Sequence, residues 1–227
     1  MHALILAAGR GERLRPLTDT TPKPLLRAGS CSLIEHHLHA LAAAGIGSIV
    51  INHAHLGQQI VSTLGDGSDY GIRIEYSAEP EGALETAGGI VNALSLIGSD
   101  PFAVVNGDIW TDYPFERLRR EIPGLAHLVL VSNPAHQPGG DFLLNGDRAS
   151  DKSSGSAGRP LTFSGIGIYR HALFDDLAPT RAPLAPLLRR AMSKGKVTGE
   201  HYTGRWIDVG TPERLAELDA ELCARGC

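Results

Sequence analysis

Residues 3–24 decide the fold, and their sequence is ALILAAGRGERLRPLTDTTPKP. The apolar run over residues 3–8 is typical of a strand that is buried on both faces of a parallel sheet. Two glycines follow at once, and glycine permits a positive φ and a close approach of a ligand to the main chain. Arg13, Arg15 and Lys23 then add three cations. Backbone N–H groups combined with several cations suit a triphosphate better than a neutral ligand.

The spacing of the glycines distinguishes this loop from other nucleotide-binding loops. A dinucleotide-binding fingerprint needs a third glycine at position 14, which is leucine here. A P-loop needs Gly-Lys-Ser/Thr, and no such tripeptide follows. The prolines at positions 16, 22 and 24 also prevent a long helix from starting here. The loop is therefore predicted to be a phosphate cradle of a different kind.

Short apolar strands alternate with helices through the first half of the chain. The strands are expected at residues 3–8, 49–52, 72–76 and 102–106, and the helices at residues 32–44, 56–64 and 85–94. Ser32 and Glu35 have the spacing of a capping box, and Gly45 is a natural residue to end that helix. Alternation of this kind predicts repeated βαβ units and a parallel sheet, which is the α/β class.

The second half of the chain is more mixed. Strands are expected at residues 128–131, 162–169 and 206–209, and a flexible loop rich in Gly, Ser and charge at residues 145–160. Thr211 is expected to cap a final helix that has Pro212 at its first position. Because the sequence shows no long linker and no internal repeat, its 227 residues predict one domain, residues 1–227.

The composition excludes several classes of protein. The chain has 21 Lys and Arg and 25 Asp and Glu, so its net charge is 21 − 25 = −4, and no basic stripe favours binding to nucleic acid. No apolar run approaches the ~18–20 residues that cross a bilayer, and the apolar start is too short for a signal peptide. Three cysteines without ligand-like spacing favour a reducing compartment. We therefore expect a cytoplasmic protein with no membrane or nucleic-acid partner and no evident protein partner.

The chain resembles the sugar-1-phosphate nucleotidyltransferases, also called NDP-sugar pyrophosphorylases. Their signature is a strand, Gly-x-Gly-x-Arg-x-x-Pro, a threonine and then Pro-Lys-Pro, and residues 6–24 carry it intact. Two later segments, Asn-Gly-Asp at residues 106–108 and Trp-Ile-Asp-Val-Gly-Thr at residues 206–211, are similar to other family motifs. The resemblance implies a Rossmann-like three-layer (GT-A-like) fold with a mostly parallel central sheet. It also implies a nucleotide-binding half, residues 1–112, and a sugar-phosphate-binding half, residues 113–227.

The resemblance also implies roles for individual residues. The catalytic residues are Arg15, Lys23 and Asp108. The nucleotide is contacted by Ala7, Gly9, Gly11, Glu12, Arg13, Lys23 and Glu79, and the sugar by Asn106 and Gly140. The base is expected against the main chain of residues 6–8 and against residues 79–84. A carboxylate at position 79 could accept a hydrogen bond from the N–H of uracil, thymine or guanine, and it disfavours adenine and cytosine.

Two aspartates are expected to hold Mg²⁺. Asp108 follows the apolar strand at residues 102–106, and Asp208 lies at a similar strand end. Either residue alone could merely cap a turn. Mg²⁺ in proteins is usually bound by one or two carboxylates, with waters and substrate phosphates completing the octahedron. As a pair in this chain, the two aspartates therefore predict metal binding.

Several short stretches narrow the substrate. Residues 51–54, 56–60, 84–86, 105–112 and 199–202 look like a subgroup that works in bacterial cell-wall (peptidoglycan) recycling. This resemblance implies UTP and N-acetylmuramate α-1-phosphate as substrates, and UDP-N-acetylmuramate and pyrophosphate as products. Two alternatives remain: a thymidylyl- or guanylyltransferase acting on a hexose or heptose 1-phosphate, and a non-catalytic nucleotide-sugar sensor.

Overall fold

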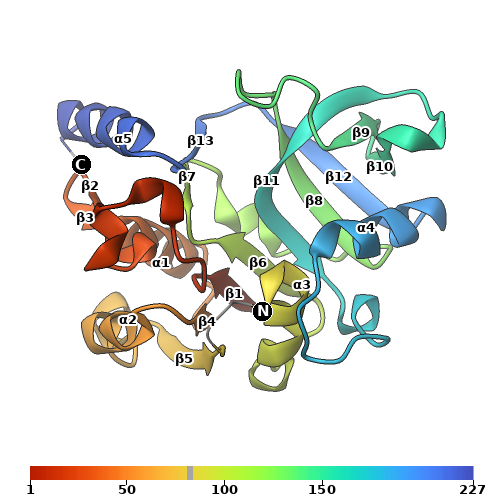
Figure 1. The fold of residues 1–227 in the computed structure, drawn as a ribbon. Helices are drawn as coiled ribbons and strands as arrows, with labels where there is room; N and C mark the ends of the chain where they lie inside the picture. The colour runs from red at the N-terminus through yellow and green to blue at the C-terminus, as the bar shows by residue number, and fades with distance from the viewer. Residues whose placement is uncertain (81–83, 227) are drawn as a thin grey trace.

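A nine-stranded sheet forms the centre of the computed structural model, which describes residues 1–80 and 84–226. The strand order is β5-β4-β1-β6-β11-β8-β12-β10-β9 (Figure 1). These strands are β1 (His2–Leu6), β4 (Ser48–His53), β5 (Arg73–Ala78), β6 (Phe102–Asn106), β8 (Ala126–Val131), β9 (Phe142–Asn145), β10 (Arg148–Asp151), β11 (Arg159–Tyr169) and β12 (Val197–Tyr202). Two small ladders join β2 (Arg27–Ala28) to β3 (Cys31–Ser32) and β7 (Ile109–Thr111) to β13 (Trp206–Asp208).

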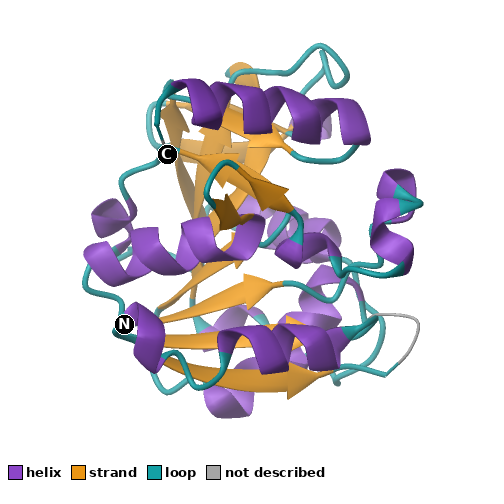
Figure 2. Cartoon of the chain, turned by 90° about the vertical axis from the view of Figure 1, so that its left-hand side faces the viewer, coloured by secondary structure: helices purple, strands orange, loops and turns teal. Residues whose placement is uncertain are grey.

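Helices lie on both faces of this sheet (Figure 2). They are α1 (Leu33–Ala43), α2 (Gly57–Leu64), α3 (Glu85–Ala93), α4 (Leu184–Ser193) and α5 (Pro212–Ala224). The predicted capping box of Ser32 and Glu35 is confirmed at the start of α1. Thr211 caps α5 as expected, because its side chain accepts a hydrogen bond from the main-chain N–H of Arg214. Helix α4 and the strands β9, β10 and β12 were not predicted from the sequence.

The expectation of a mostly parallel sheet is wrong, because the sheet is mixed. Four of its described strand pairings are parallel and five are antiparallel. The half formed by β5, β4, β1 and β6 is parallel, whereas β11 is antiparallel to β6, β8 and β9. The physical reason is the connections: helical crossovers join the first four strands, but β9 and β10 are joined directly by a two-residue turn at Gly146, which has φ +59°.

The prediction of a flexible loop at residues 145–160 is also wrong. Strand β10 lies inside this segment, and β11 begins at Arg159, three residues before the expected strand. The segment is polar because residues 145–148 and 152–160, on either side of the two buried positions of β10, are all exposed. This leaves too few apolar residues to show the alternation of a strand.

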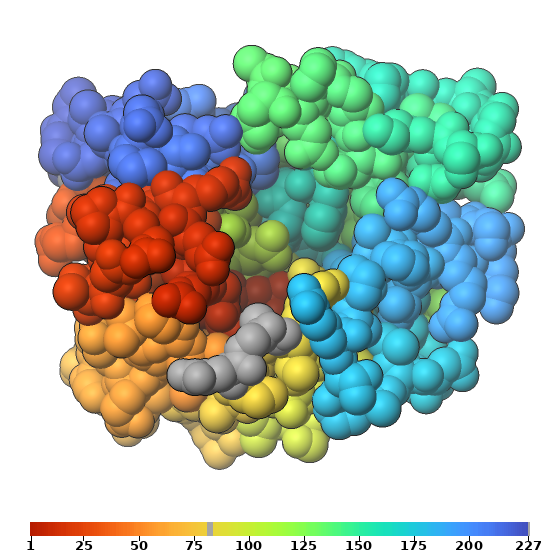
Figure 3. All heavy atoms as spheres, in the orientation of Figure 1, coloured from red at the N-terminus to blue at the C-terminus, as the bar shows by residue number. Residues whose placement is uncertain are grey.

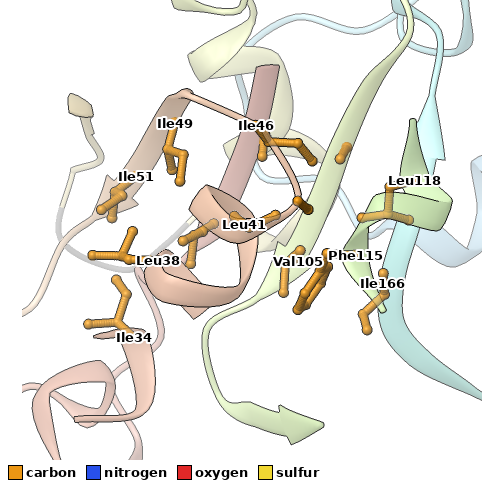
Figure 4. Packing of buried hydrophobic residues seen from close by; sticks show 14 of the residues in the cluster. Ile34, Leu38, Leu41, Ile46, Ile49, Ile51, Val105, Phe115, Leu118 and Ile166 are labelled. Atoms are coloured by element: carbon orange, nitrogen blue, oxygen red, sulfur yellow. The ribbon is translucent and has the colours of Figure 1, made fainter. Parts of the chain in front are cut away.

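Alternate residues of the central strands face two different cores. Ala3 and Ile5 of β1 belong to the core under α1 and α2, whereas Leu4 belongs to the core under α3 and α4. Figure 4 shows the first of these cores, in which side chains of α1 pack beside those of β4 and β6; the labelled members are Ile34, Leu38, Leu41, Ile49, Ile51 and Val105. This two-sided burial explains why β1 was recognisable as a continuous apolar run.

A third core joins three stretches that are far apart in the sequence: residues 14–33, residue 110 in β7, and residues 207–222 of β13 and α5. Its members are Leu14, Leu26, Ala28, Leu33, Trp110, Ile207, Val209, Leu215, Leu218 and Leu222. The predicted apolar stripe of the last helix, Leu215, Leu218 and Leu222, therefore packs on the amino-terminal loop. Among the described residues, every helix is too short or too polar to cross a lipid bilayer.

His37 of α1 ties this helix to the segment that follows β6. Its ring is buried, and its Nε2 lies 2.9 Å from the carbonyl oxygen of Ile109. Burial lowers the pKa of His37 to about 4, because the charged ring would lose its hydration. The same effect of burial lowers the pKa of His127 to about 4.

We predict that the protein loses stability as the pH falls from about 6.5 to about 4. In this range the unfolded chain binds protons at positions 37 and 127 that the folded protein excludes, so the free energy of unfolding falls with falling pH. His37→Gln removes one of the histidines whose pKa burial lowers. Its thermal midpoint should fall less steeply over this pH range than that of the unaltered protein. Equal slopes for the two proteins would contradict the assignment.

Candidate active site

A cavity of about 480 Å³ opens where β1, β4 and β6 end. Its described lining comes from the loop after β1, from the ends of β4 and β6 and from the start of α3: Leu6, Ala7, Ala8, Gly9, Gly11, Glu12, Arg13, Leu14, Lys23, Pro24, Asn52, Glu79, Glu85, Thr86, Asn106, Gly107, Asp108 and Gly210. Figure 3 shows a hollow on this face, beside the amino-terminal residues drawn in red. The carboxyl ends of parallel strands are the usual place for a ligand in an open α/β sheet.

Gly11 is the glycine that the loop requires. It has φ +69° and precedes a 3-10 turn (Glu12–Leu14), and its carbonyl oxygen accepts hydrogen bonds from the N–H of Leu14 and the hydroxyl of Thr18, both at 2.9 Å. A Cβ on Gly11 would lie 3.0 Å from Thr18 Cγ2 and 3.1 Å from Lys23 Cβ. Gly9 does not have a positive φ, and no described atom lies within 4 Å of where its Cβ would be. The expectation of positive φ therefore holds for Gly11 only, and Gly9 leaves space on the cavity side.

Lys23 and Asp108 meet at the floor of the cavity. The Lys23 side chain is 8% exposed, and its Nζ donates a hydrogen bond to Asp108 Oδ2 at 2.8 Å. A buried ammonium group needs an anionic partner, because leaving it alone in the interior would cost several kcal/mol. The structure therefore brings together two of the three residues that were expected to be catalytic.

The third residue, Arg15, lies apart from them. Its side chain is 58% exposed, its Nε donates to Asp19 Oδ1 at 2.7 Å, and it is absent from the described lining of the cavity. The physical reason is local: the chain leaves the 3-10 turn in an extended conformation at Arg15, with φ −61° and ψ 143°. A catalytic role for Arg15 stays a prediction.

Asp108 and Asp208 lie on adjacent segments although 100 residues separate them. In the ladder of β7 and β13, Asp208 is opposite Ile109, and the main-chain N–H of Val209 donates to the carbonyl oxygen of Asp108 at 3.0 Å. Gly107 lets the chain after β6 pass close to the end of β1, because a Cβ there would lie 2.8 Å from the carbonyl oxygen of Leu6. Asp108 lines the cavity, whereas Asp208 is absent from its described lining, although Gly210, two residues further on, belongs to it.

The two aspartates fit a divalent ion that arrives with a phosphate ligand. No group of three or more His, Cys, Asp or Glu that could hold a metal occurs among the described residues. Proteins nevertheless usually supply only one or two carboxylates to Mg²⁺ when substrate phosphates provide further oxygen ligands. The donor atoms here are all hard oxygens, which suits Mg²⁺ rather than zinc or copper.

Arg13 lies between the glycine loop and Asp208. A Cβ on Gly210 would stand 3.0 Å from Arg13 Nη2 and 3.2 Å from Asp208 Oδ1. Arg13 and Glu12 both line the cavity. Arg13 therefore presents a guanidinium group where a triphosphate beside the two aspartates would need one.

A chain of hydrogen bonds supports the opposite end of the cavity. The main-chain N–H of Ala7 donates to Asn52 Oδ1 at 2.6 Å, and Asn52 Nδ2 donates to Glu79 Oε1 at 2.5 Å. The main-chain N–H of Leu84 donates to Glu79 Oε2 at 2.9 Å. Both oxygens of Glu79 are thus held by the protein, so this carboxylate anchors the wall of the cavity in addition to lining it. Of the predicted base-binding segment, residues 81–83 lie outside the described residues.

Asn52 was not expected in the site. The signal in the sequence was its position: it follows the apolar residues 49–51 near the end of β4, as Asn106 follows the apolar residues of β6. Polar residues at such strand ends face the ligand edge of a parallel sheet. Asn106, which was predicted to contact the sugar, lines the cavity.

Gly140, the other predicted sugar contact, lies in a separate loop. It has φ +59°, and a Cβ on it would stand 2.7 Å from Asn133 Oδ1 and from the carbonyl oxygen of Leu161. Its own carbonyl oxygen accepts a hydrogen bond from Lys152 Nζ at 2.5 Å. Gly140 is absent from the described lining of the cavity, and its contact with a sugar stays a prediction.

The sequence of residues 2–135 matches the nucleotidyl transferase family. The chain is 54% identical to the N-acetylmuramate alpha-1-phosphate uridylyltransferase of Neisseria meningitidis, over 97% of each chain. It is 31% identical to the protein of the same name in Caulobacter vibrioides, over 97% of this chain and 96% of the other. It is 34% identical to the mannose-1-phosphate guanyltransferase of Aspergillus fumigatus, and the match covers 94% of this chain but 62% of that longer protein.

Solved structures share the fold. A candidate glucose-1-phosphate thymidylyltransferase from Bacillus anthracis superposes with a TM-score of 0.84 at 24% identity, over 98% of this chain and 95% of the other. The inositol-1-phosphate CTP transferase of T. maritima superposes with a TM-score of 0.77 at 19% identity, over 97% of this chain and 95% of the other.

We predict that Gly11→Ala will weaken triphosphate binding, because the new methyl group crowds Thr18 and Lys23. An alanine held in the left-handed backbone conformation of position 11 also lowers the free energy of unfolding by ~1–2 kcal/mol. Gly71→Ala is the matched control, since Gly71 has φ +68° but no described atom near the position of a Cβ. Backbone strain should lower the free energy of unfolding of both variants by a similar amount, measured by chemical denaturation. Crowding of the new methyl group should lower that of Gly11→Ala further. Only Gly11→Ala should lose nucleotide affinity in calorimetry; equal affinity in both variants would contradict the role of the loop.

Proposed function

The chain belongs to the nucleotidyl transferase family and is an enzyme of that class, and from that premise we propose that it transfers a uridylyl group from UTP to N-acetylmuramate α-1-phosphate. The products are UDP-N-acetylmuramate and pyrophosphate. The observation that carries this assignment is the identity of 54%, over 97% of each chain, to the Neisseria meningitidis protein named for this reaction. The setting that this reaction implies is peptidoglycan recycling in the cytoplasm.

The reaction needs no nucleophile from the protein. A phosphate oxygen of the sugar 1-phosphate attacks the α-phosphorus of UTP, a new P–O bond forms, and the bond between the α- and β-phosphates breaks as pyrophosphate leaves. Catalysis then consists mainly of positioning and of neutralising negative charge. The cavity has the groups for this task, because it combines main-chain N–H groups after β1 with the cations Arg13 and Lys23.

Lys23 is proposed to neutralise the phosphates at the reacting centre. In the ligand-free protein its ammonium group is paired with Asp108 at the cavity floor. A triphosphate carries more negative charge than one carboxylate and would offer the same ammonium group a stronger partner. We assign Arg15 a role at the α- and β-phosphates, which requires its side chain to leave Asp19 and turn toward the cavity.

Asp108 and Asp208 are proposed to hold Mg²⁺. When bound, the ion would add positive charge beside the phosphates and favour departure of pyrophosphate. The support is the ladder between β7 and β13 and the hydrogen bond that follows it, which bring the main chain of residues 208 and 209 beside that of residues 108 and 109. The two halves of the chain then divide the substrates, with residues 1–112 binding the nucleotide and residues 113–227 the sugar phosphate. Asn106, near the end of the first half, and Gly140, in the second half, are proposed to contact the sugar.

We predict that UTP with N-acetylmuramate α-1-phosphate gives the highest kcat/KM in a panel that also contains dTTP, GTP, CTP and ATP. The sugar phosphates in the panel are those of N-acetylglucosamine, glucose and mannose, and release of pyrophosphate is measured. GTP with mannose 1-phosphate is the informative competitor, because relatives with that specificity align over 94% of this chain. A higher kcat/KM for any other pair would overturn the substrate assignment while leaving the enzyme class intact.

We predict that Asp108→Asn lowers kcat on the order of 10²-fold, because it removes charge from the metal site and leaves Lys23 buried without its anion. Asp176→Asn is the control, since Asp176 is an exposed aspartate that pairs with Arg190 away from the cavity. Its kcat should equal that of the unaltered protein. Retention of full activity by Asp108→Asn would exclude Asp108 from the reaction.

A further inference from the structure

Arg214, in the first turn of α5, holds the side chain of Asp208 from behind. Its Nη1 lies 2.9 Å from Asp208 Oδ2 and 3.3 Å from the main-chain carbonyl oxygen of the same residue. One guanidinium nitrogen therefore bridges the side chain and the main chain of Asp208. Such a bridge is satisfied by one orientation of the carboxylate and not by the other staggered rotamers.

The start of α5 fixes the position of Arg214. Its main-chain N–H donates to the hydroxyl of Thr211, the residue that caps the helix, at 3.4 Å. Leu215, the next residue, is buried in the third core together with Ile207 and Val209 on either side of Asp208. Arg214 and Asp208 thus lie on two segments that pack in the same core. Their side chains are 21% and 23% exposed, so solvent screens this ion pair only partly.

Asp208 Oδ2 carries the contact with Arg214, and Oδ1 lies 3.2 Å from where a Cβ of Gly210 would stand. Gly210 lines the cavity, whereas Asp208 and Arg214 are both absent from its described lining. The arginine is therefore bonded to one of the two carboxylate oxygens of Asp208, two residues away from the cavity wall in the chain.

We propose that Arg214 is a positioning residue, which holds Asp208 in the orientation that a divalent ion needs and makes no contact with the nucleotide. This inference rests on the proposed function, because it takes Asp208 as a metal ligand. Groups that hydrogen-bond to a metal ligand from behind typically change metal affinity by ~10–100-fold when removed. His136 is the other described basic group beside the carboxylate, with its Nε2 3.8 Å from Oδ2.

The sign of the effect separates orientation from plain electrostatics. The charge of Arg214 repels a divalent cation, so its removal would tighten metal binding if charge alone mattered. If the bridge to Asp208 matters more, its removal weakens metal binding. The two accounts therefore predict opposite changes for the same variant.

The experiment measures Mn²⁺ binding by electron paramagnetic resonance, in the presence of a UTP analogue whose bond between the α- and β-phosphates resists cleavage. We expect Arg214→Ala to weaken Mn²⁺ binding at least tenfold. Arg214→Lys, which keeps the charge and one donor, should recover part of the loss. Arg225→Ala is the matched control, because Arg225 forms an ion pair with Glu221 at the other end of α5. Its Mn²⁺ affinity should equal that of the unaltered protein.

A second measurement, binding of UTP in the presence of EDTA, tests whether Arg214 touches the nucleotide. Metal-free affinity should change less than twofold in Arg214→Ala, and a parallel loss of metal-free affinity would overturn the proposal. Unchanged or tighter Mn²⁺ binding would overturn it as well. If Arg214→Ala fails to fold by circular dichroism, Arg214→Gln keeps most of the side-chain length and is held to the same criteria.

Asp208→Asn distinguishes failure of this proposal from failure of the proposed function. If Asp208→Asn weakens Mn²⁺ binding and Arg214→Ala does not, Asp208 is a metal ligand that needs no positioning by Arg214, and only the present inference fails. If Asp208→Asn binds Mn²⁺ as tightly as the unaltered protein, the metal assignment itself is wrong and the inference fails with it.

Discussion

The short ladder between β7 and β13 is the constraint on which the site depends. It places Asp208 opposite Ile109 and ties the N–H of Val209 to the carbonyl oxygen of Asp108. Two main-chain segments that are 100 residues apart in the chain therefore lie side by side at Asp108 and Asp208. The third core makes this pairing stable, because it buries residues of both strands against α5 and against the loop that follows β1. The same packing brings the glycine loop, with Arg13 and Lys23, to the two aspartates.

The cavity is polar at both ends, and each end is held in a different way. At one end, Lys23 and Asp108 neutralise each other across 2.8 Å. At the other end, Glu79 is fixed by two hydrogen bonds and links Asn52 to the main chain of Leu84. The first end is suited to phosphates because its charges can exchange partners when an anion enters. The second is suited to a neutral base because its shape is set by bonds within the protein.

The first half of the fold could be read from the sequence because its signals are local. Strand β1 is buried on both faces, and the capping box at Ser32 and the proline at the start of α5 mark helix ends within a few residues. The strands β9 and β10 could not be predicted, since each has only four residues and shows no clear alternation of apolar and polar side chains. The mixed character of the sheet was missed because the antiparallel pairing of β11 with β6 and β8 joins segments far apart in the chain.

The residues of the candidate site that belong to a sequence motif could be predicted. The residues whose place in the site depends on tertiary contacts could not. Gly11, Arg13, Lys23 and Asp108, which the signature names, all line one cavity. The signature could not show that Asn52 bonds to the loop or that Glu79 is held by two partners, because these contacts depend on long-range packing of β4 against β1. It likewise gave no sign that Arg15 pairs with Asp19.

The account stands on the convergence of the amino-terminal loop and two distant aspartates on one metal–triphosphate complex. A crystal structure with Mn²⁺ and a non-reactive UTP analogue, with the ion located by its anomalous scattering, tests this most directly. The account predicts one anomalous peak within about 2.3 Å of oxygens from both Asp108 and Asp208, with the triphosphate on the loop at Gly11. An ion bound by neither carboxylate, or a triphosphate seated away from that loop, would contradict it.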